Sequence, residues 1–423
     1  MPGPLDGLRV IEVTTAIQGP AVGLFFANMG ADVIKIEPPT GDASRHYRGP
    51  NNSLPEDALA PAFVAFNKGK RSLTLDVHSE LGGSVMERLL DDADVFFSNF
   101  RAGALQRMGL GLDELAAKYP NLVIGHVNGF GPHGPDADKA MLDGAAQARG
   151  GLMSLSGRPG EIPNPPGAAL ADTGGGLQLA LACVTALVAR ATTGRGQVVR
   201  TSALGMQLWL QQWEIQHAAM TGSALTREAN HHPIMRAPYG VYETVDGEYI
   251  MFVVAMTNDA WDAFWIFADQ PERILDENWN EPLKRIGASG STEGLADIRS
   301  AMREAFRSRS TDDWVTFLYE QPEIIWERVR GHEDVLADQQ NIENGYITDV
   351  DLDVLGATRT TGTLMEFSAT ATGAIGRPPA LGEHSREVMG ELGFSEQDVE
   401  AVSERCEQVR RDLLAGTGDG LWE

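Results

Sequence analysis

The chain of 423 residues has only two cysteines, Cys183 and Cys406, far apart in the sequence. Two thiols build no disulfide framework, so a reducing, cytoplasmic environment is expected. The N-terminal sequence has no charged segment followed by an apolar one, and no signal peptide is expected. The longest apolar run of interest, Leu179–Ala189, is about half a membrane span. The sequence therefore predicts a soluble cytoplasmic protein without a membrane partner.

Positive charge is also scarce. Lysine and arginine total 34 against 59 aspartates and glutamates, a net charge of −25. A surface this acidic repels phosphate backbones and anionic headgroups, which argues against nucleic-acid and membrane partners. Hydrophobic residues make up 43% and charged residues 22%, a globular composition with enough chain to bury a core without disulfides or metal.

Familiar cofactor motifs are missing or incomplete. The segment Gly129–Gly134 (GFGPHG) matches G-x-G-x-x-G, but Pro132 and the residues after it predict a turn where a dinucleotide site needs a helix. The nine histidines form no HExxH motif, and neither a P-loop nor a G-x-S-x-G elbow occurs. We expect no metal site, and nicotinamide or flavin binding has little support.

The first 200 residues alternate between strand-like and helix-like segments, which predicts a doubly wound α/β domain. Strands are expected at Leu8–Thr14, Val33–Glu37, Asp94–Ser98, Asn121–Val127 and Val198–Ser202, and helices at Ala21–Met29, Leu81–Asp91, Leu112–Lys118 and Leu177–Arg190. The last of these helices is apolar on nearly every side, so we expect it to be buried. The Gly- and Pro-rich segment Ser154–Gly175 before it is expected to be a loop.

The pattern changes after residue 224. Two apolar runs flank Asp246-Gly247, which predicts a β-hairpin over Tyr239–Val254. Helices are then expected at Asp259–Ala268, Leu295–Arg307 and Thr311–Tyr319, followed by a polar stretch, a β-rich tail and a helix over Glu396–Leu414. This arrangement predicts a smaller α+β domain.

Asp172, in the sequence AALADTGGG (168–176), is the most informative polar residue. Aspartate is a favoured helix N-cap, and Asp172 stands where the apolar helix should begin. The same position also suits a nucleophile, because a helix N-terminus keeps a carboxylate ionised and the glycines let a ligand approach the backbone. Both interpretations stay open on local grounds.

Cations gather around the expected strand ends. Asn99–Gly103 directly follows a strand, where open α/β sheets bind ligands. Basic side chains cluster there in an otherwise acidic chain, which suggests either a phosphorylated ligand or a solvated basic face; they are Lys68, Lys70, Arg71, Arg101, Arg107 and Lys139.

Several motifs together resemble the class III CoA-transferases, the family that includes formyl-CoA:oxalate CoA-transferase, carnitine CoA-transferase and 2-methylacyl-CoA racemase. They span nearly the whole chain and comprise PLDGLRVIEV, GADVIKIEPPTGD (30–42), NKGKRSLTLD (67–76), NFRAGALQRMGLG (99–111), the ALAD of 169–172, TGRGQ (193–197) and ALGEHSREVMGELG (380–393).

The resemblance implies a Rossmann-like large domain over 1–200, completed by 345–423, and a small α+β domain over 225–335. Segments 201–224 and 336–344 are then linkers. It also implies a homodimer of two chains threaded through each other as interlocked rings.

The family's aspartate nucleophile falls on Asp172. By resemblance, its carboxylate attacks an acyl-CoA donor, for which succinyl-CoA is a candidate. The reaction then passes through a mixed anhydride and an aspartyl-CoA thioester before CoA reaches a free carboxylic acid. CoA is a substrate, and no tightly bound cofactor is implied. Backbone N–H groups near Gly174, Gly175 and Gly176 are expected to stabilise the oxyanions. The CoA-contacting positions fall on Ile17, Gln18, Leu75, Asn99, Phe100, Arg101, Arg107 and Lys139.

Two alternatives remain. In racemases of the family a His-Asp pair moves the α-proton, but Leu142-Asp143 stands here, and leucine cannot carry a proton. A non-catalytic acyl-CoA-binding relative would not need Asp172.

Some transferases of the family have a catalytic glutamine at the position that Ile17 occupies here, and Gln18 is the next residue. His231, His232 and Arg236 either meet a second substrate carboxylate or lie on the surface.

Overall fold

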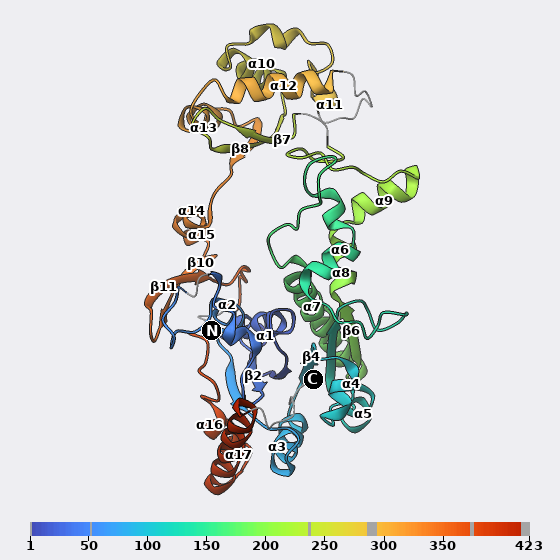
Figure 1. The fold of residues 1–423 in the computed structure, drawn as a ribbon, viewed down its shortest axis with the longest axis vertical. Helices are drawn as coiled ribbons and strands as arrows, with labels where there is room; N and C mark the ends of the chain where they lie inside the picture. The colour runs from blue at the N-terminus through green and yellow to red at the C-terminus, as the bar shows by residue number, and fades with distance from the viewer. Residues whose placement is uncertain (1, 51–52, 236–237, 286–293, 373–375, 416–423) are drawn as a thin grey trace. The chain divides into compact units, whose positions relative to one another are not determined.

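In the computed structural model, residues 2–50, 53–235, 238–285, 294–372 and 376–415 are described (Figure 1). By their internal contacts they form two compact units. The large unit comprises residues 1–150, 168–210 and 336–423, and the small unit comprises 151–167 and 211–335. The residues that line the cavity described for the candidate site all belong to the large unit.

A six-stranded sheet forms the centre of the large unit. Its strand order is β3-β2-β1-β4-β5-β6, and every neighbouring pair is parallel. The chain therefore winds outward in one direction from β1 to β3 and in the other from β4 to β6, so the direction reverses between β1 and β4. The strands are β1 (Arg9–Val13), β2 (Asp32–Glu37), β3 (Arg71–Thr74), β4 (Val95–Ser98), β5 (Val123–Asn128) and β6 (Val198–Ser202).

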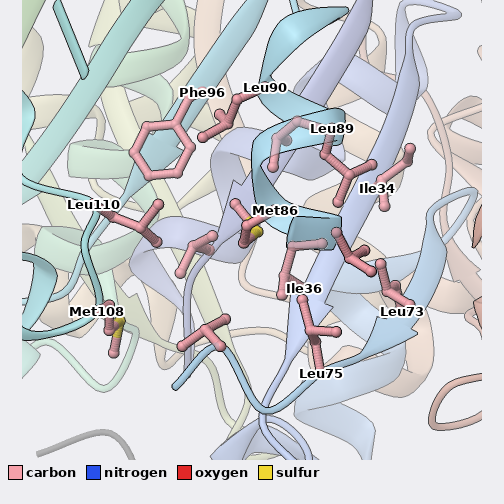
Figure 2. Close-up of a cluster of buried hydrophobic side chains, with 14 of the residues drawn as sticks. Ile34, Ile36, Leu73, Leu75, Met86, Leu89, Leu90, Phe96, Met108 and Leu110 are labelled. Atoms are coloured by element: carbon pink, nitrogen blue, oxygen red, sulfur yellow. The ribbon is translucent and has the colours of Figure 1, made fainter. Parts of the chain in front are cut away.

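Alternation along these strands builds two hydrophobic layers. Val10 is paired with Val33 and Val95, and all three pack with α1 (Gln18–Asn28) and α7 (Leu170–Thr193). The next residue, Ile11, points to the opposite face, where Figure 2 shows Ile34, Leu73 and Phe96 packed with residues of α3 (Glu80–Asp91). Because both faces are covered by helices, the residues that form these two layers are apolar, as expected for a parallel sheet. The buried charged residues of β1 and β2 are exceptions.

The β1–α1–β2 unit predicted from the sequence is confirmed, with Gly30 in the left-handed conformation at φ 91° after the helix. The segment after β5 is a turn without a helix, as Pro132 predicted, and Gly131 has φ 102°. The strand β3 was missed, because RSLT is short and lies within a charged motif. Its position at the edge of the sheet is stabilised by contacts with C-terminal residues, among them Gly382, which donates a hydrogen bond to Ser72.

Helix α7 differs from the prediction in two ways. It begins at Leu170 instead of Leu177, so part of the expected loop is helical. It is also buried on one face only: Leu181 and Val188 are 65% and 66% exposed in the single chain. By length and composition alone α7 is apolar enough to cross a membrane, a test that core helices of soluble proteins also pass.

The C-terminal segment packs onto the β3 side of the sheet. The hairpin β10 (Ile347–Leu352) and β11 (Gly356–Thr361) is followed by α16 (Ser385–Glu391), which contacts β3, and by α17 (Glu396–Leu414), which contacts α3. Ser72 accepts a hydrogen bond from the N–H of Gly382 at 2.9 Å, and Arg405 pairs with Asp76 at 2.8 Å. In Figure 1 these late helices, drawn in red, lie beside the early blue elements.

The small unit contains an antiparallel sheet of β7 (Gly240–Glu243), β8 (Tyr249–Ala255) and β9 (Ile324–Arg328). The predicted hairpin and its Gly247 turn are confirmed, whereas β9, which lies between the last predicted helix and the polar stretch, was not predicted. Aromatic side chains form most of the core, and Trp314 lies 4.6 Å from Phe306 and 5.2 Å from Phe264 between ring centroids. The helices here are α9 (Gln212–Thr221), α10 (Asn258–Phe267), α11 (Pro282–Arg285), α12 (Leu295–Phe306) and α13 (Thr311–Tyr319).

The other helices are short. They are α2 (Pro61–Asn67), α4 (Ala102–Arg107), α5 (Leu112–Lys118), α6 (Asp143–Arg149), α8 (Ala203–Leu210), α14 (His332–Ala337) and α15 (Gln339–Glu343).

Candidate active site

A cavity of about 1030 Å³ opens at the carboxyl ends of the central strands. Thr15 and Ala16, which follow β1, line it together with Asn99, which follows β4. These two strands flank the point where the winding direction reverses, which is where open α/β sheets bind their ligands. Asp172 lies in the wall of the same cavity.

Asp172 is not the N-cap of α7. The N-cap is Ala169, which makes no side-chain cap hydrogen bond, and Asp172 is the third residue of the first helical turn. None of the described residues donates a hydrogen bond to the Asp172 carboxylate. A partly buried carboxylate without a protein partner is unusual, since such groups are normally satisfied.

Asp143 takes the capping role instead. Its Oδ1 accepts hydrogen bonds from the backbone N–H groups of Ala171 at 2.7 Å and of Asp172 at 3.2 Å. Burial and, in second place, the negative charge of Asp143 raise the pKa of Asp172 to about 6. Asp172 is therefore a more basic carboxylate than usual, contrary to the expectation that the helix terminus would simply favour its charge.

The three glycines after Asp172 do not form the expected loop. Gly174, Gly175 and Gly176 lie inside α7, where backbone N–H groups bond to carbonyls four residues earlier. A Cβ atom on Gly176 would fall 2.5 Å from the carbonyl oxygen of Gln18, and one on Gly174 would fall 2.8 Å from Met206. These glycines permit close packing of α7 against α1 and α8, which explains them without a ligand.

Gln18 is the first residue of α1 and lines the cavity. Its side chain is only 5% exposed, and its Nε2 is buried without a hydrogen-bond partner among the described residues. The neighbouring Ile17 is the N-cap of α1 and does not line the cavity.

The turn before α1 is held by side chains distant in sequence. The Asn99 side chain accepts from the N–H of Thr15 at 3.0 Å and donates to the Thr15 carbonyl at 2.9 Å. Ala16 has φ 67°, a left-handed conformation that is rare for alanine. Its N–H donates to Asp42 Oδ1 at 2.9 Å.

The predicted CoA-contacting residues separate into two groups. Gln18, Asn99, Arg101 and Lys139 line the cavity. Leu75 is fully buried in the sheet core, Phe100 packs against that core, and Arg107 is exposed at the end of α4; none of these three lines the cavity.

Three of the six basic residues predicted to cluster near the ligand instead pair with other residues of the fold, away from the cavity. Lys70 is buried 2.8 Å from Glu12, Arg71 pairs with Asp32 and Glu391, and Lys68 donates to Thr360 at 2.7 Å. These residues stabilise the fold, so only Arg101 and Lys139 of the cluster reach the cavity.

Two of the cavity residues that sequence reasoning missed lie on strands of the central sheet. Arg200 lies on β6 and pairs with Asp113 at 3.3 Å, and His126 lies on β5 with its Nε2 2.8 Å from the Phe100 carbonyl oxygen. Burial lowers the pKa of His126. A polar residue inside each apolar strand was the available signal.

The histidines of the small unit are held by local contacts. His232 lies between the rings of Trp213 and Tyr239, and its Nδ1 accepts from the N–H groups of Ile234 and Met235. His231 Nδ1 is 3.1 Å from the Tyr239 carbonyl oxygen. Arg236 lies outside the described residues. Among the described residues, no group of three or more histidines, cysteines and acids is arranged to hold a metal ion.

Comparison with known proteins covers almost the whole chain. The sequence profile of CoA-transferase family III matches residues 5–385. The succinyl-CoA–D-citramalate CoA-transferase of Chloroflexus aurantiacus is 31% identical over 403 residues, covering 94% of this chain and 96% of that protein. The (R)-2-hydroxy-4-methylpentanoate CoA-transferase of Clostridioides difficile is 28% identical over 397 residues, covering 93% and 97%.

The fold agrees with this assignment. A crystal structure of a CaiB/BaiF family protein from Brucella suis matches with a TM-score of 0.81 at 30% identity, covering 93% of this chain and 100% of that one. That agreement includes the mixed α/β architecture with its parallel six-stranded sheet. The protein therefore belongs to CoA-transferase family III and is a CoA-transferase.

Proposed function

We propose that this enzyme moves CoA from an acyl-CoA thioester to a free carboxylic acid, with Asp172 as the nucleophile. The observation that carries the proposal is the free carboxylate of Asp172 in the cavity wall. With a pKa of about 6 it is ionised near neutral pH and more basic than an ordinary aspartate, which favours attack on a thioester.

The reaction then proceeds by balanced exchanges. An oxygen of Asp172 attacks the donor thioester carbonyl, the C–S bond breaks, and a mixed anhydride and CoA thiolate result. The thiolate attacks the aspartyl carbonyl, which releases the donor carboxylate and leaves an aspartyl-CoA thioester. The acceptor carboxylate attacks this thioester, and the thiolate released attacks the acyl carbonyl of the new anhydride. Asp172 is regenerated.

Other cavity residues have supporting roles in this proposal. Gln18 Nε2 is a buried donor that has no partner among the described residues, so it suits the oxygen that becomes negative during each attack. Gly174–Gly176 are less suited to that role, because their N–H groups belong to α7. Asn99, Arg101 and Lys139 would bind CoA, and the two cations suit its phosphates.

The donor we propose is succinyl-CoA. Support comes from the relative named succinyl-CoA–D-citramalate CoA-transferase and from a second, a succinyl-CoA:mesaconate CoA-transferase of Haloarcula hispanica that is 28% identical. We propose no tightly bound cofactor, since every step exchanges groups of similar activation.

We also propose a cytoplasmic homodimer with the predicted division into domains. Apolar side chains that are exposed in the single chain support a partner surface in the large unit, including Leu181 and Val188 on α7 and Trp209 on α8, which is 63% exposed. The interlocked-ring arrangement follows from the family resemblance alone.

Racemisation is the weaker alternative. Leu142, which lines the cavity, cannot transfer a proton, and Asp143 already accepts hydrogen bonds from α7. In heavy water the transferase should leave the α-proton of a 2-methylacyl-CoA unexchanged; rapid exchange would favour the racemase.

The test is replacement of Asp172 by asparagine. Asp172→Asn should lower transfer by more than about 10³-fold while CoA binding persists. Wild-type enzyme given donor alone should form an adduct at Asp172 that hydroxylamine cleaves, detected by mass spectrometry. Asp138→Asn is the matched control, because Asp138 is another carboxylate lining the cavity. Substantial activity in Asp172→Asn, or an adduct at another residue, would contradict the mechanism. A mass-spectrometric screen of donors and acceptors tests the substrates.

A further inference from the structure

Asp143 connects two helices at the cavity. It is the first residue of α6, and its Oδ1 accepts the N–H groups of Ala171 and Asp172 at 2.7 and 3.2 Å. Its Oδ2 accepts from Nε2 of Gln147, one turn later on α6, and this Nε2 also donates to the Ala168 carbonyl at 3.0 Å. Gln147 is 1% exposed and Asp143 is partly buried, so water has limited access to these bonds.

These contacts hold the beginning of α7 from one side. The first N–H groups of a helix have no intrahelical acceptor, and aspartates in the first turn are common acceptors for them. Here Asp143 supplies the acceptor from another helix. The Asp172 carboxylate consequently makes no cap hydrogen bond and stays exposed to the cavity.

We propose that Asp143 is a positioning residue for the transfer reaction: it caps α7 in place of Asp172, and so keeps the Asp172 carboxylate unpaired and directed at the thioester. This inference rests on the proposed function, because it assigns a role relative to Asp172. It separates two tasks, helix capping and nucleophilic attack, that a single aspartate could not perform at once.

The carboxylates of Asp143 and Asp172 also differ in the number of hydrogen bonds that offset their burial. Asp143 accepts three hydrogen bonds, whereas Asp172 accepts none from the described residues. Burial first, and Asp143 second, raise the pKa of Asp172. Other charged or titratable side chains that line the cavity could also influence Asp172; they are Arg101, Asp113, Glu114, His126, His133, Asp138, Lys139 and Arg200. The helices α1 and α8, which also pack against α7, carry no charged residues.

The experiment compares Asp143→Asn with Asp143→Ala in the full-length enzyme. Asparagine keeps Oδ1 as an acceptor but removes the charge. We expect its kcat at pH 8 to stay within about threefold of wild type, while the acid limb of its kcat/KM profile moves down by about one pH unit. Alanine removes the cap as well, and its kcat at pH 8 should fall by about 10- to 100-fold, more than KM for acyl-CoA changes.

Asp136→Asn is the matched control. Asp136 pairs with Arg149 at the other end of α6, so this variant removes one charge from the same region without touching α7. Its acid limb should coincide with wild type. Full kcat in Asp143→Ala overturns the inference, and so does a kcat of Asp143→Asn at pH 8 that falls about 10-fold or more, because asparagine keeps the acceptor that caps α7. If Asp143→Ala does not fold, Asp143→Asn still decides.

The two hypotheses fail differently. Activity retained in Asp172→Asn contradicts the proposed function itself. Loss of activity in Asp172→Asn, combined with wild-type behaviour of both Asp143 variants, contradicts only the positioning role.

Discussion

The two units bury very different side chains. The large unit buries a network of charged side chains near the ends of β1, β2 and β3. Lys35 lies 2.8 Å from Glu12 and 2.7 Å from Asp42, and the network continues to the buried Lys70 and Glu37 and to the partly buried Arg45. The small unit instead stacks aromatic rings around Phe264 and Trp314. Its buried Arg285 has neutral acceptors, among them the Trp279 carbonyl at 2.9 Å.

This difference shows what each core does. An aromatic core contributes mainly stability, because its contacts are largely non-directional. A buried ionic network is a weak source of stability, because desolvation offsets the attraction. Its directional bonds hold a specific geometry here: Lys35 donates to the Thr14 carbonyl, and Asp42 accepts the N–H of the left-handed Ala16, which lines the cavity. The charges therefore serve the site more than the fold.

The largest expected effect comes from breaking this network. Burial alone would lower the pKa of Lys35, but Asp42 and Glu12 raise it above its ordinary value, so Lys35 is charged. Lys35→Met leaves an excess of buried negative charge, and we expect a loss of about 3–5 kcal/mol in unfolding free energy. The KM for acyl-CoA should also rise, by about tenfold, because the Thr15–Ala16 turn loses its support. Denaturant unfolding and steady-state kinetics measure the two effects.

The control for this variant lies in the aromatic core. Phe264→Leu should cost about 1 kcal/mol and leave KM unchanged. An unaltered KM in Lys35→Met, or an equal rise in KM in Phe264→Leu, would show that the two cores do not differ in this way.

A smaller effect concerns Asp172, the partly buried carboxylate of the large unit that accepts no hydrogen bond from the described residues. The folded-state pKa of Asp172 is raised from 3.8 to about 6, so the protonated form stabilises the fold and this contribution is lost as the pH rises through 6. Asp172→Asn never carries the charge. It should therefore be more stable than wild type by roughly 1–2 kcal/mol at pH 8, with the advantage gone below about pH 4.

Unfolding of wild type and Asp172→Asn across this pH range measures the difference. Asp42→Asn provides the contrast, because Lys35 and hydrogen bonds from Ser44 outweigh burial and lower the pKa of Asp42. That variant should be less stable than wild type at neutral pH. If Asp172→Asn were more stable than wild type by the same free energy at every pH, burial of the charged Asp172 carboxylate would not be the cause of the difference.

The smallest effect should be the same in both units. Ser310 caps α13 in the small unit and Ser395 caps α17 in the large unit, each in a capping box with an aspartate three residues later. Ser310→Ala and Ser395→Ala should each cost about 1 kcal/mol without changing kcat. Thermal unfolding measures both losses, and a fall in kcat for either variant would contradict their purely local role.

Local sequence patterns predicted the helices and strands well where an element buries either both of its faces or a single stripe of side chains. Five of the strands of the central sheet and the helices α3, α5, α13 and α17 follow from apolar periodicity, because both strand faces or one helix stripe are buried. The start of α7 could not be predicted in this way. Three consecutive glycines disfavour a helix, and only close packing against α1 and Met206 offsets that cost.

The site was predicted in part. Asp172 and Gln18 were both named from the sequence, and the structure places them in one cavity. Leu75 and Arg107 were carried over by resemblance, but the first is a core residue and the second lies outside the cavity. Three-dimensional packing assigns such residues, since a motif fixes residue type and not the direction of a side chain.

The sequence by itself determined most of the strands and helices, the family, and the presence of an aspartate near the beginning of an apolar helix, because these depend on periodicity and on residue identity. Only the tertiary structure decided which carboxylates are neutralised and which is left free. Asp42 meets Lys35, and Asp143 meets the N–H groups of a helix that begins 27 residues later. Contacts of this kind join segments that only folding brings together, so no local pattern contains them.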